Sequence, residues 1–148
     1  MLQTNHLGSP FYILNFVHVI LHLVALFCLT VMWTAQRIFI EIINFEFGWQ
    51  LIPILCLWFT LLVSAYVCFG GLTDRPVLGS WPKQRIEIIY AIGLAALLLS
   101  VGLQTWIMFP AWYDPFFQIR YLIACITTWI LLFTWIAFLV LHLLRVRN

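Results

Sequence analysis

The sequence predicts an all-α integral membrane protein, a bundle of four transmembrane helices joined by short loops. Of the 148 residues, 65% are hydrophobic and only 8% are charged, whereas soluble domains carry about 25% charged residues. The hydrophobic residues gather in four runs, each long enough for the roughly 20 residues that cross a bilayer core as a helix. These runs are 11–36, 49–69, 86–109 and 119–144. What lies between them is too short for a second domain, so residues 1–148 are expected to form a single membrane domain.

The first run, 11–36, begins next to Pro10, whose missing amide hydrogen costs little in the first turn of a helix. No Lys or Arg precedes it, and it is about twice as long as the core of a signal peptide, so we expect it to stay as a span. The segment 37–48 remains apolar between its charges, and it either lies on the membrane surface or prolongs the first helix. In the second case Arg37 and Glu41 would lie one turn apart and could pair.

The later runs are separated by stretches that end helices. A segment rich in Gly and Pro follows 49–69, and such a composition ends one helix and delays the next. Pro110 and Pro115 predict a short turn between 86–109 and 119–144, because proline disfavours helix both at its own position and before it.

The third run is the richest in small residues. Ala91 with Ala95, and Ala96 with Ser100, are pairs at four-residue spacing, which let helix backbones approach one another closely. We therefore expect the third helix to be central to the bundle. The small residues expected in its packing surface are Ala91, Gly93, Ala95, Ala96, Ser100 and Gly102.

Basic residues are unequally divided between the two ends of the predicted bundle. Of seven Lys and Arg residues, five lie in the middle loop or near the C-terminus: Arg75, Lys83, Arg85, Arg145 and Arg147. Arg37 and Arg120 lie at the other end. The positive-inside rule then places both termini on the cytoplasmic side.

The net charge of +2 is too small to indicate a nucleic-acid partner. The length of the first and fourth runs favours the plasma membrane or an endomembrane, with the mitochondrial inner membrane as an alternative.

The eight tryptophans lie at two depths. Five are at or beside the ends of runs, where the headgroup boundary favours an amphipathic ring: Trp33, Trp49, Trp81, Trp106 and Trp112. Three lie well inside the second and fourth runs, where an indole N–H needs a hydrogen-bond acceptor. Four helices could hardly cover all the aromatic residues around the fourth run. We therefore expect contact with other protein or specific lipid, the alternative being ordinary lipid exposure, at Trp58, Trp129, Phe133, Trp135 and Phe138.

A polar stripe runs along the first helix. Asn15, His18 and His22 follow three- and four-residue spacing, which places them on one face. Polar residues inside a membrane indicate a functional site by default. The favoured interpretation is structural, with neutral imidazoles that bond to a neighbouring helix or to a lipid headgroup.

Two alternatives assign chemistry to this stripe. One is a b-type haem, for which imidazoles on facing helices supply the axial ligands. His18 and His22 project from the same side of one helix, so a second ligand would have to come from elsewhere, and His142 is the other histidine within a run. The second alternative is a proton or quinone site, for which Glu87 is the nearby carboxylate.

Other chemical motifs are missing from the sequence. It contains no HExxH, no glycine loop for phosphate and no paired carboxylates. The four cysteines, Cys28, Cys56, Cys68 and Cys125, all fall inside runs, where they serve as small apolar packing residues rather than metal ligands. We therefore expect no enzymatic activity and no metal. We also expect no cofactor, unless one of the two alternatives above, haem or quinone, applies.

Four spans, short loops, termini on the cytoplasmic side and Glu87 at the start of the third helix resemble tetraspan membrane proteins of the MARVEL type. The likeness is one of topology and covers the whole chain. It implies a non-enzymatic organiser of membrane domains or vesicle traffic. More broadly, we expect an accessory, assembly or organising subunit that contacts membrane lipids and associates laterally with a larger integral membrane protein or with copies of itself. The alternative is a haem or quinone subunit of an electron-transfer complex that uses His18 or His22.

Overall fold

The computed structural model describes residues 10–33, 38–40, 50–72, 83–111 and 115–147. Its elements are α1 (Pro10–Thr30), β1 (Val31–Trp33), β2 (Ile38–Ile40), α2 (Leu51–Leu72), α3 (Lys83–Ala111) and α4 (Pro115–Arg147). All four helices are long and apolar enough to cross a membrane. The predicted class, four helices of membrane-spanning length, is confirmed. The side of the membrane on which the termini lie stays a prediction.

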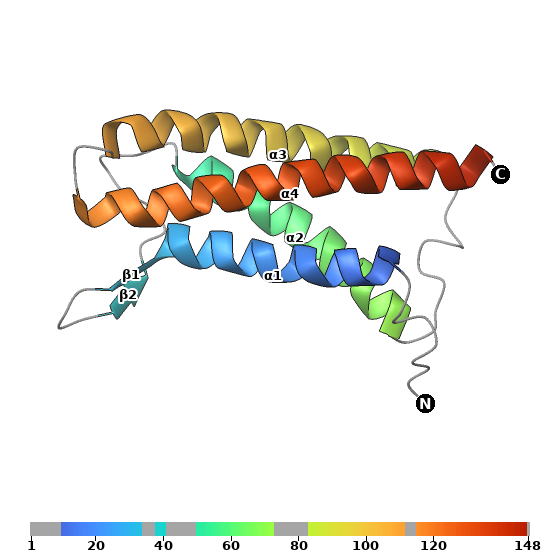
Figure 1. Cartoon of the computed structure of the whole chain (residues 1–148), viewed down its shortest axis with the longest axis horizontal. Coiled ribbons are helices and arrows are strands. Elements are labelled where there is room, and N and C mark those ends of the chain that lie inside the picture. Colours follow the sequence, from blue (N-terminus) through green and yellow to red (C-terminus); the bar gives the residue numbers. More distant parts are fainter. Residues whose placement is uncertain (1–9, 34–37, 41–49, 73–82, 112–114, 148) are drawn as a thin grey trace.

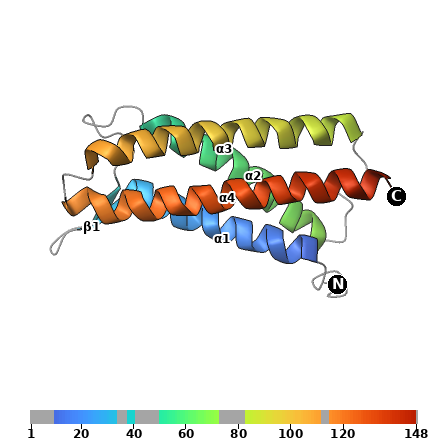
Figure 2. The same cartoon turned by 45° about the horizontal axis from the view of Figure 1, so that its top comes forward.

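The helices form an antiparallel ring in which each contacts two others. α1 packs on α2 and α4, and α3 also packs on α2 and α4. α1 begins and α4 ends at the same end of the bundle (Figure 1). The expectation that α3 would be central is wrong, because a ring of four has no central member. α2 runs obliquely to the other three helices, a tilt that is also clear after rotation (Figure 2).

The first apolar run is not a single helix. α1 ends at Thr30, whose hydroxyl donates to the carbonyl of Leu26 over 2.7 Å. The next three residues pair antiparallel with β2, with Val31 opposite Ile40. β-branched residues favour strands, so this segment is extended although it is as apolar as the helix before it. The expectations of a span to residue 36 and of a prolonged first helix are therefore wrong. Arg37 and Glu41 themselves lie outside the described residues.

Side chains from elsewhere in the chain cap the C-terminal end of α1. The last carbonyls of a helix have no partner within it. Here Arg120 of α4 donates from Nε and Nη2 to the carbonyl of Cys28, both over 3.2 Å. Gln50, just before α2, donates to the carbonyl of Leu29 and accepts from the hydroxyl of Tyr121 over 2.9 Å. A guanidinium also suits the negative end of the helix dipole. Polar contacts thus connect the helices at the end of the bundle where α1 ends and α4 begins.

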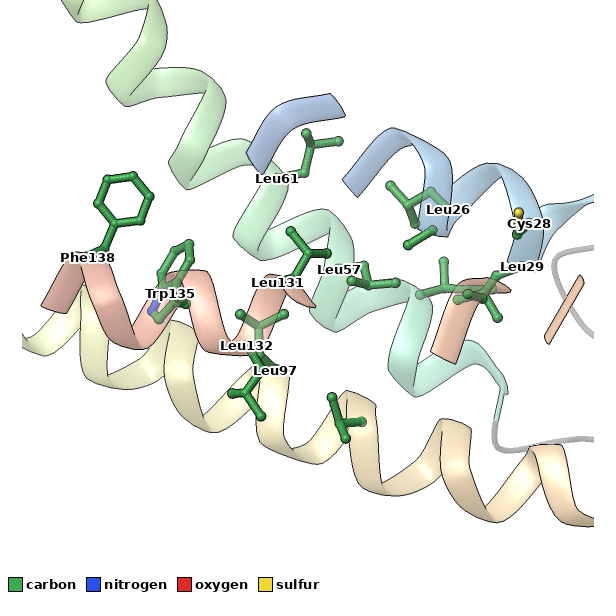
Figure 3. Packing of buried hydrophobic residues seen from close by; sticks show 14 of the residues in the cluster. Leu26, Cys28, Leu29, Leu57, Leu61, Leu97, Leu131, Leu132, Trp135 and Phe138 are labelled. Atoms are coloured by element: carbon green, nitrogen blue, oxygen red, sulfur yellow. The ribbon is translucent and has the colours of Figure 1, made fainter. Parts of the chain in front are cut away.

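The core is a column of apolar side chains along the axis of the ring (Figure 3). Leu29, Leu57, Leu97 and Leu131 come one from each helix and are at most 1% exposed. In lipid, helices gain little from the hydrophobic effect, so close packing and hydrogen bonds between helices stabilise such a bundle.

The small residues of α3 divide between its two faces. The inward face contains Gly93 and Ser100, both buried, with Ala96 half-buried beside them. Ala91, Ala95 and Gly102 are exposed, so their expected place in the packing surface is wrong. The inward stripe runs through Tyr90, Gly93, Leu97, Ser100, Val101 and Gln104. Three- and four-residue steps along this stripe turn the other small residues away from the bundle.

Candidate functional site

The polar stripe of α1 faces the interior of the bundle. Asn15 is 3% exposed, and His18 and His22 are fully buried. Their spacing predicted one face, and that face contacts both α2 and α4 through the two imidazoles. A buried imidazole in an apolar bundle requires hydrogen-bond partners, and the partners define what this region can do.

His22 links α1 to α2 through both of its ring nitrogens. Nδ1 lies 2.7 Å from the carbonyl of His18, and because a carbonyl only accepts, Nδ1 carries the proton. In the neutral ring Nε2 then accepts from the hydroxyl of Thr60, 2.7 Å away in α2. The same hydroxyl lies 3.0 Å from the carbonyl of Cys56, but its single proton serves one acceptor at a time. The carbonyl of His18 therefore fixes the tautomer of the ring, and Nε2 is left to accept from Thr60.

His18 links α1 to α4. Its Nε2 is hydrogen-bonded to the hydroxyl of Thr134, and among the described residues its Nδ1 has no hydrogen-bond partner. The ring stacks on Trp135 with 5.7 Å between centroids and meets the ring of Phe138 edge-on at 5.3 Å. The two imidazoles lie 5.5 Å apart, centroid to centroid, in a tilted arrangement. This end of the interior is therefore a cluster of rings with threonine hydroxyls on either side.

Trp135 and Phe138 lie inside the bundle, each 1% exposed. The expectation that they contact an external partner or lipid is wrong. A buried indole N–H needs an acceptor, and the acceptor is in the same chain. Nε1 of Trp135 donates to the carbonyl of Tyr90 over 3.0 Å. The glycine at position 93 makes this possible, because its missing side chain leaves the space that the indole fills.

A second polar cluster, between α3 and α4, was not predicted from the sequence. Gln104 donates to the hydroxyls of Ser100 and Thr128, each over 2.9 Å. All three side chains are at most 3% exposed. A glutamine four residues from a serine within an apolar run was the available signal, because that spacing puts both on one helix face.

Three of the five aromatic residues assigned to external contact do lie on the outer surface. Trp58 is 48% exposed, Trp129 is 42% exposed and Phe133 is 62% exposed. Trp129 stacks on Phe133 with 5.8 Å between centroids and 29° between planes. In the part of the chain that the structure describes, neither Trp58 nor Trp129 has a hydrogen-bond acceptor for its indole N–H. Both rings are thus partly available to a neighbour.

The haem and quinone alternatives stay predictions. An iron at Nε2 of His18 or of His22 would have to displace a threonine hydroxyl. The side chain of His142 lies outside the described part, as do those of Trp33, Trp49, Trp81 and Trp112. Glu87 is half-buried near the start of α3. Within the described residues no group of three or more His, Cys, Asp and Glu side chains is placed to hold a metal ion.

Comparisons with known protein families, with curated proteins and with solved structures gave no match to this chain. The resemblance to MARVEL-type tetraspans therefore stays a prediction from topology.

Proposed function

We propose that this protein is a non-enzymatic membrane subunit that associates laterally with another integral membrane protein or with a second copy of itself, through the outer face of α4. The observation that carries the proposal is Trp129. Its ring is 42% exposed, and its N–H has no acceptor within the described part of the chain. A neighbouring protein in the membrane would supply that acceptor.

The depth of Trp129 makes its N–H informative. The membrane-spanning segment of α4 runs from Ile119 to Val140, so at 1.5 Å per residue Trp129 lies about 15 Å from its start. That depth is the middle of a hydrocarbon core about 30 Å thick. Neither water nor a headgroup reaches an N–H there, and leaving such a group without an acceptor is unfavourable. A partner that accepts from Trp129 removes this cost.

Phe133 adds an apolar surface beside this donor. Its stacking on Trp129 holds two rings in a fixed relation on one side of α4. Aromatic side chains are enriched in interfaces, since they offer a large contact area with few rotatable bonds. The pair combines an unsatisfied polar group with a rigid apolar surface, the combination expected of a contact between membrane proteins.

The buried polar residues support the non-enzymatic part of the proposal. His22 is bonded to Thr60, His18 to Thr134 and Gln104 to Thr128. Each of these contacts joins two helices, and hydrogen bonds of this kind contribute on average about 0.6 kcal/mol in membranes. Polar groups engaged in this way hold the bundle together, and the surface left for a partner is apolar and aromatic.

The same proposal covers orientation and location. Lys83 and Arg85 lie near the start of α3, and Arg145 and Arg147 lie near the end of α4, at the end of the bundle where α1 begins. Under the positive-inside rule that end is cytoplasmic. We place the protein in the plasma membrane or an endomembrane as an accessory or organising subunit.

The test is purification in mild detergent with Trp129→Phe, which keeps the ring and removes the N–H. We expect the association constant of the complex to fall by about 3- to 20-fold, corresponding to about 0.6–1.7 kcal/mol for a hydrogen bond between membrane helices. The matched control is Trp106→Phe, because Trp106 is 74% exposed at the end of its span, where water reaches the N–H. A wild-type protein that purifies as a lone monomer, or equal effects of both variants, would contradict the proposal.

A further inference from the structure

We propose that an anionic phospholipid binds in a groove between α2 and α3, with its acyl chains against α2 and its headgroup on Arg85. The groove has a volume of about 640 Å³. Its wall is formed by side chains of α2 between Phe59 and Phe69 and by Ile89 of α3. This volume lies within the range of about 300–1,000 Å³ that is typical of ligand sites.

The oblique course of α2 accounts for the groove. In both views the last turns of α2 lie beside the first turns of α1 and diverge from the first turns of α3 (Figures 1 and 2). The lining residues of α2 run from Phe59, near the middle of the helix, to Phe69, near its end, and Ile89 belongs to the first turns of α3. The groove therefore extends from the middle of α2 toward the end of the bundle where α2 ends and α3 begins.

The lining of the groove matches the acyl chains of a lipid. Apart from the hydroxyl of Tyr66, every lining side chain is apolar. From Phe59 to Phe69 the groove extends about 15 Å along α2 at 1.5 Å per residue. An acyl chain has no side groups and follows an irregular apolar wall of this length, so the proposed occupant is hydrocarbon chain.

Arg85 supplies the charge that selects the headgroup. It lies four residues before Ile89, so both are on the same side of α3, with Arg85 one turn nearer the end of the bundle. Arg85 is exposed, and within the described part of the chain it forms no ion pair. Glu87, two residues on, does not share its face. A guanidinium one turn beyond Ile89, on the same side of α3, matches the negative headgroup of a lipid whose chains lie in the groove.

Other basic residues at this end of the molecule strengthen the preference for an anionic headgroup. Lys83 begins α3, and Arg145 and Arg147 belong to the last turn of α4, which ends at the same end of the bundle. A basic residue near an anionic membrane surface contributes about fivefold to binding. Phosphatidylserine should therefore be preferred to phosphatidylcholine with the same acyl chains, and most of the preference should depend on Arg85.

Native mass spectrometry of the whole protein in detergent tests this, with equal amounts of the two lipids added. We expect about fivefold more phosphatidylserine than phosphatidylcholine on the wild type. Arg85→Gln should remove most of this preference, whereas Arg147→Gln, which removes one charge from the same end, should keep most of it. Ala65→Trp fills the groove and should lower binding of both lipids at least threefold. Ala95→Trp, on the exposed side of α3, should not.

Each contrary result overturns a defined part of the proposal. Equal binding of both lipids to the wild type, or a preference kept by Arg85→Gln, overturns the headgroup site. Equal effects of Ala65→Trp and Ala95→Trp overturn the groove as the place of the acyl chains. If Ala65→Trp removes a dimer of this chain from the spectrum and leaves the lipid bound, the occupant is a second copy and the lipid proposal is wrong. Since these readings count lipid on the monomer, they are independent of Trp129 and of the proposed partner.

Discussion

Replacement of Gly93 by alanine should destabilise the bundle more than any comparable change on the outer face of α3. A Cβ at position 93 would lie 2.2 Å from Cζ2 and 2.8 Å from Cε2 of Trp135. The indole has little room to retreat, because the ring of His18 stacks against it and its N–H is bonded to the carbonyl of Tyr90. The new methyl group therefore forces either the indole or the backbone of α3 to move.

The expected magnitude follows from three contributions. Overpacking of a filled core costs about 1–3 kcal/mol, and loss of a membrane hydrogen bond such as that of Trp135 costs about 0.6 kcal/mol. Alanine in place of a helical glycine returns about 0.5–1 kcal/mol. The net loss is about 0.6–3 kcal/mol. At about 2–4 °C per kcal/mol for a chain of this size, Tm should fall by about 1–12 °C.

The assay is thermal unfolding in detergent, followed by near-ultraviolet circular dichroism. Gly102→Ala is the matched control, because a Cβ there would meet nothing within 4 Å, and its Tm should be equal to or slightly above that of the wild type. Trp135→Leu, which is smaller, should make the further change Gly93→Ala less costly than it is beside tryptophan. A Tm of Gly93→Ala at or above that of Gly102→Ala would refute the reasoning.

Two further predictions concern the buried histidines. Thr60→Val removes the hydroxyl that His22 contacts in α2. The control is Thr127→Val, whose buried hydroxyl, among the described residues, bonds within its own helix. In denaturation in mixed detergent, Thr60→Val should cost about 0.6–1.7 kcal/mol more stability than the control; equal losses would show that the contact between helices contributes nothing. The purified protein should show no Soret band, and a band that disappears in His18→Ala would establish the haem alternative.

The sequence predicted the helices well and their surfaces less well. Length and hydropathy located α2, α3 and α4 to within a few residues, because a span needs about 20 apolar residues. The end of α1 was missed because Val31 and Ile38 are as apolar in a strand as in a helix, and the length of a run does not distinguish the two. A hairpin depends on pairing between residues on either side of a turn, which the composition of the run does not reveal.

The candidate site was predicted in part for a similar reason. Spacing along one helix correctly grouped Asn15, His18 and His22, since helical geometry alone decides which residues share a face. It could not identify Thr60 or Thr134 as their partners, because partners depend on the relative height of two helices. The inward position of Trp135 likewise depends on a glycine in another helix, 42 residues earlier in the chain.

The caps on α1 have a consequence for how the protein is made. α1 is synthesised before α4, yet it receives its C-terminal cap from Arg120 and a partner for His18 from Thr134, both in α4. Individual spans insert in the membrane as helices before they associate. Until α4 is in the membrane, the carbonyl of Cys28 and the imidazole of His18 therefore lack the partners that they have in the folded bundle. The polar contacts of α1 are completed only when α4 joins it.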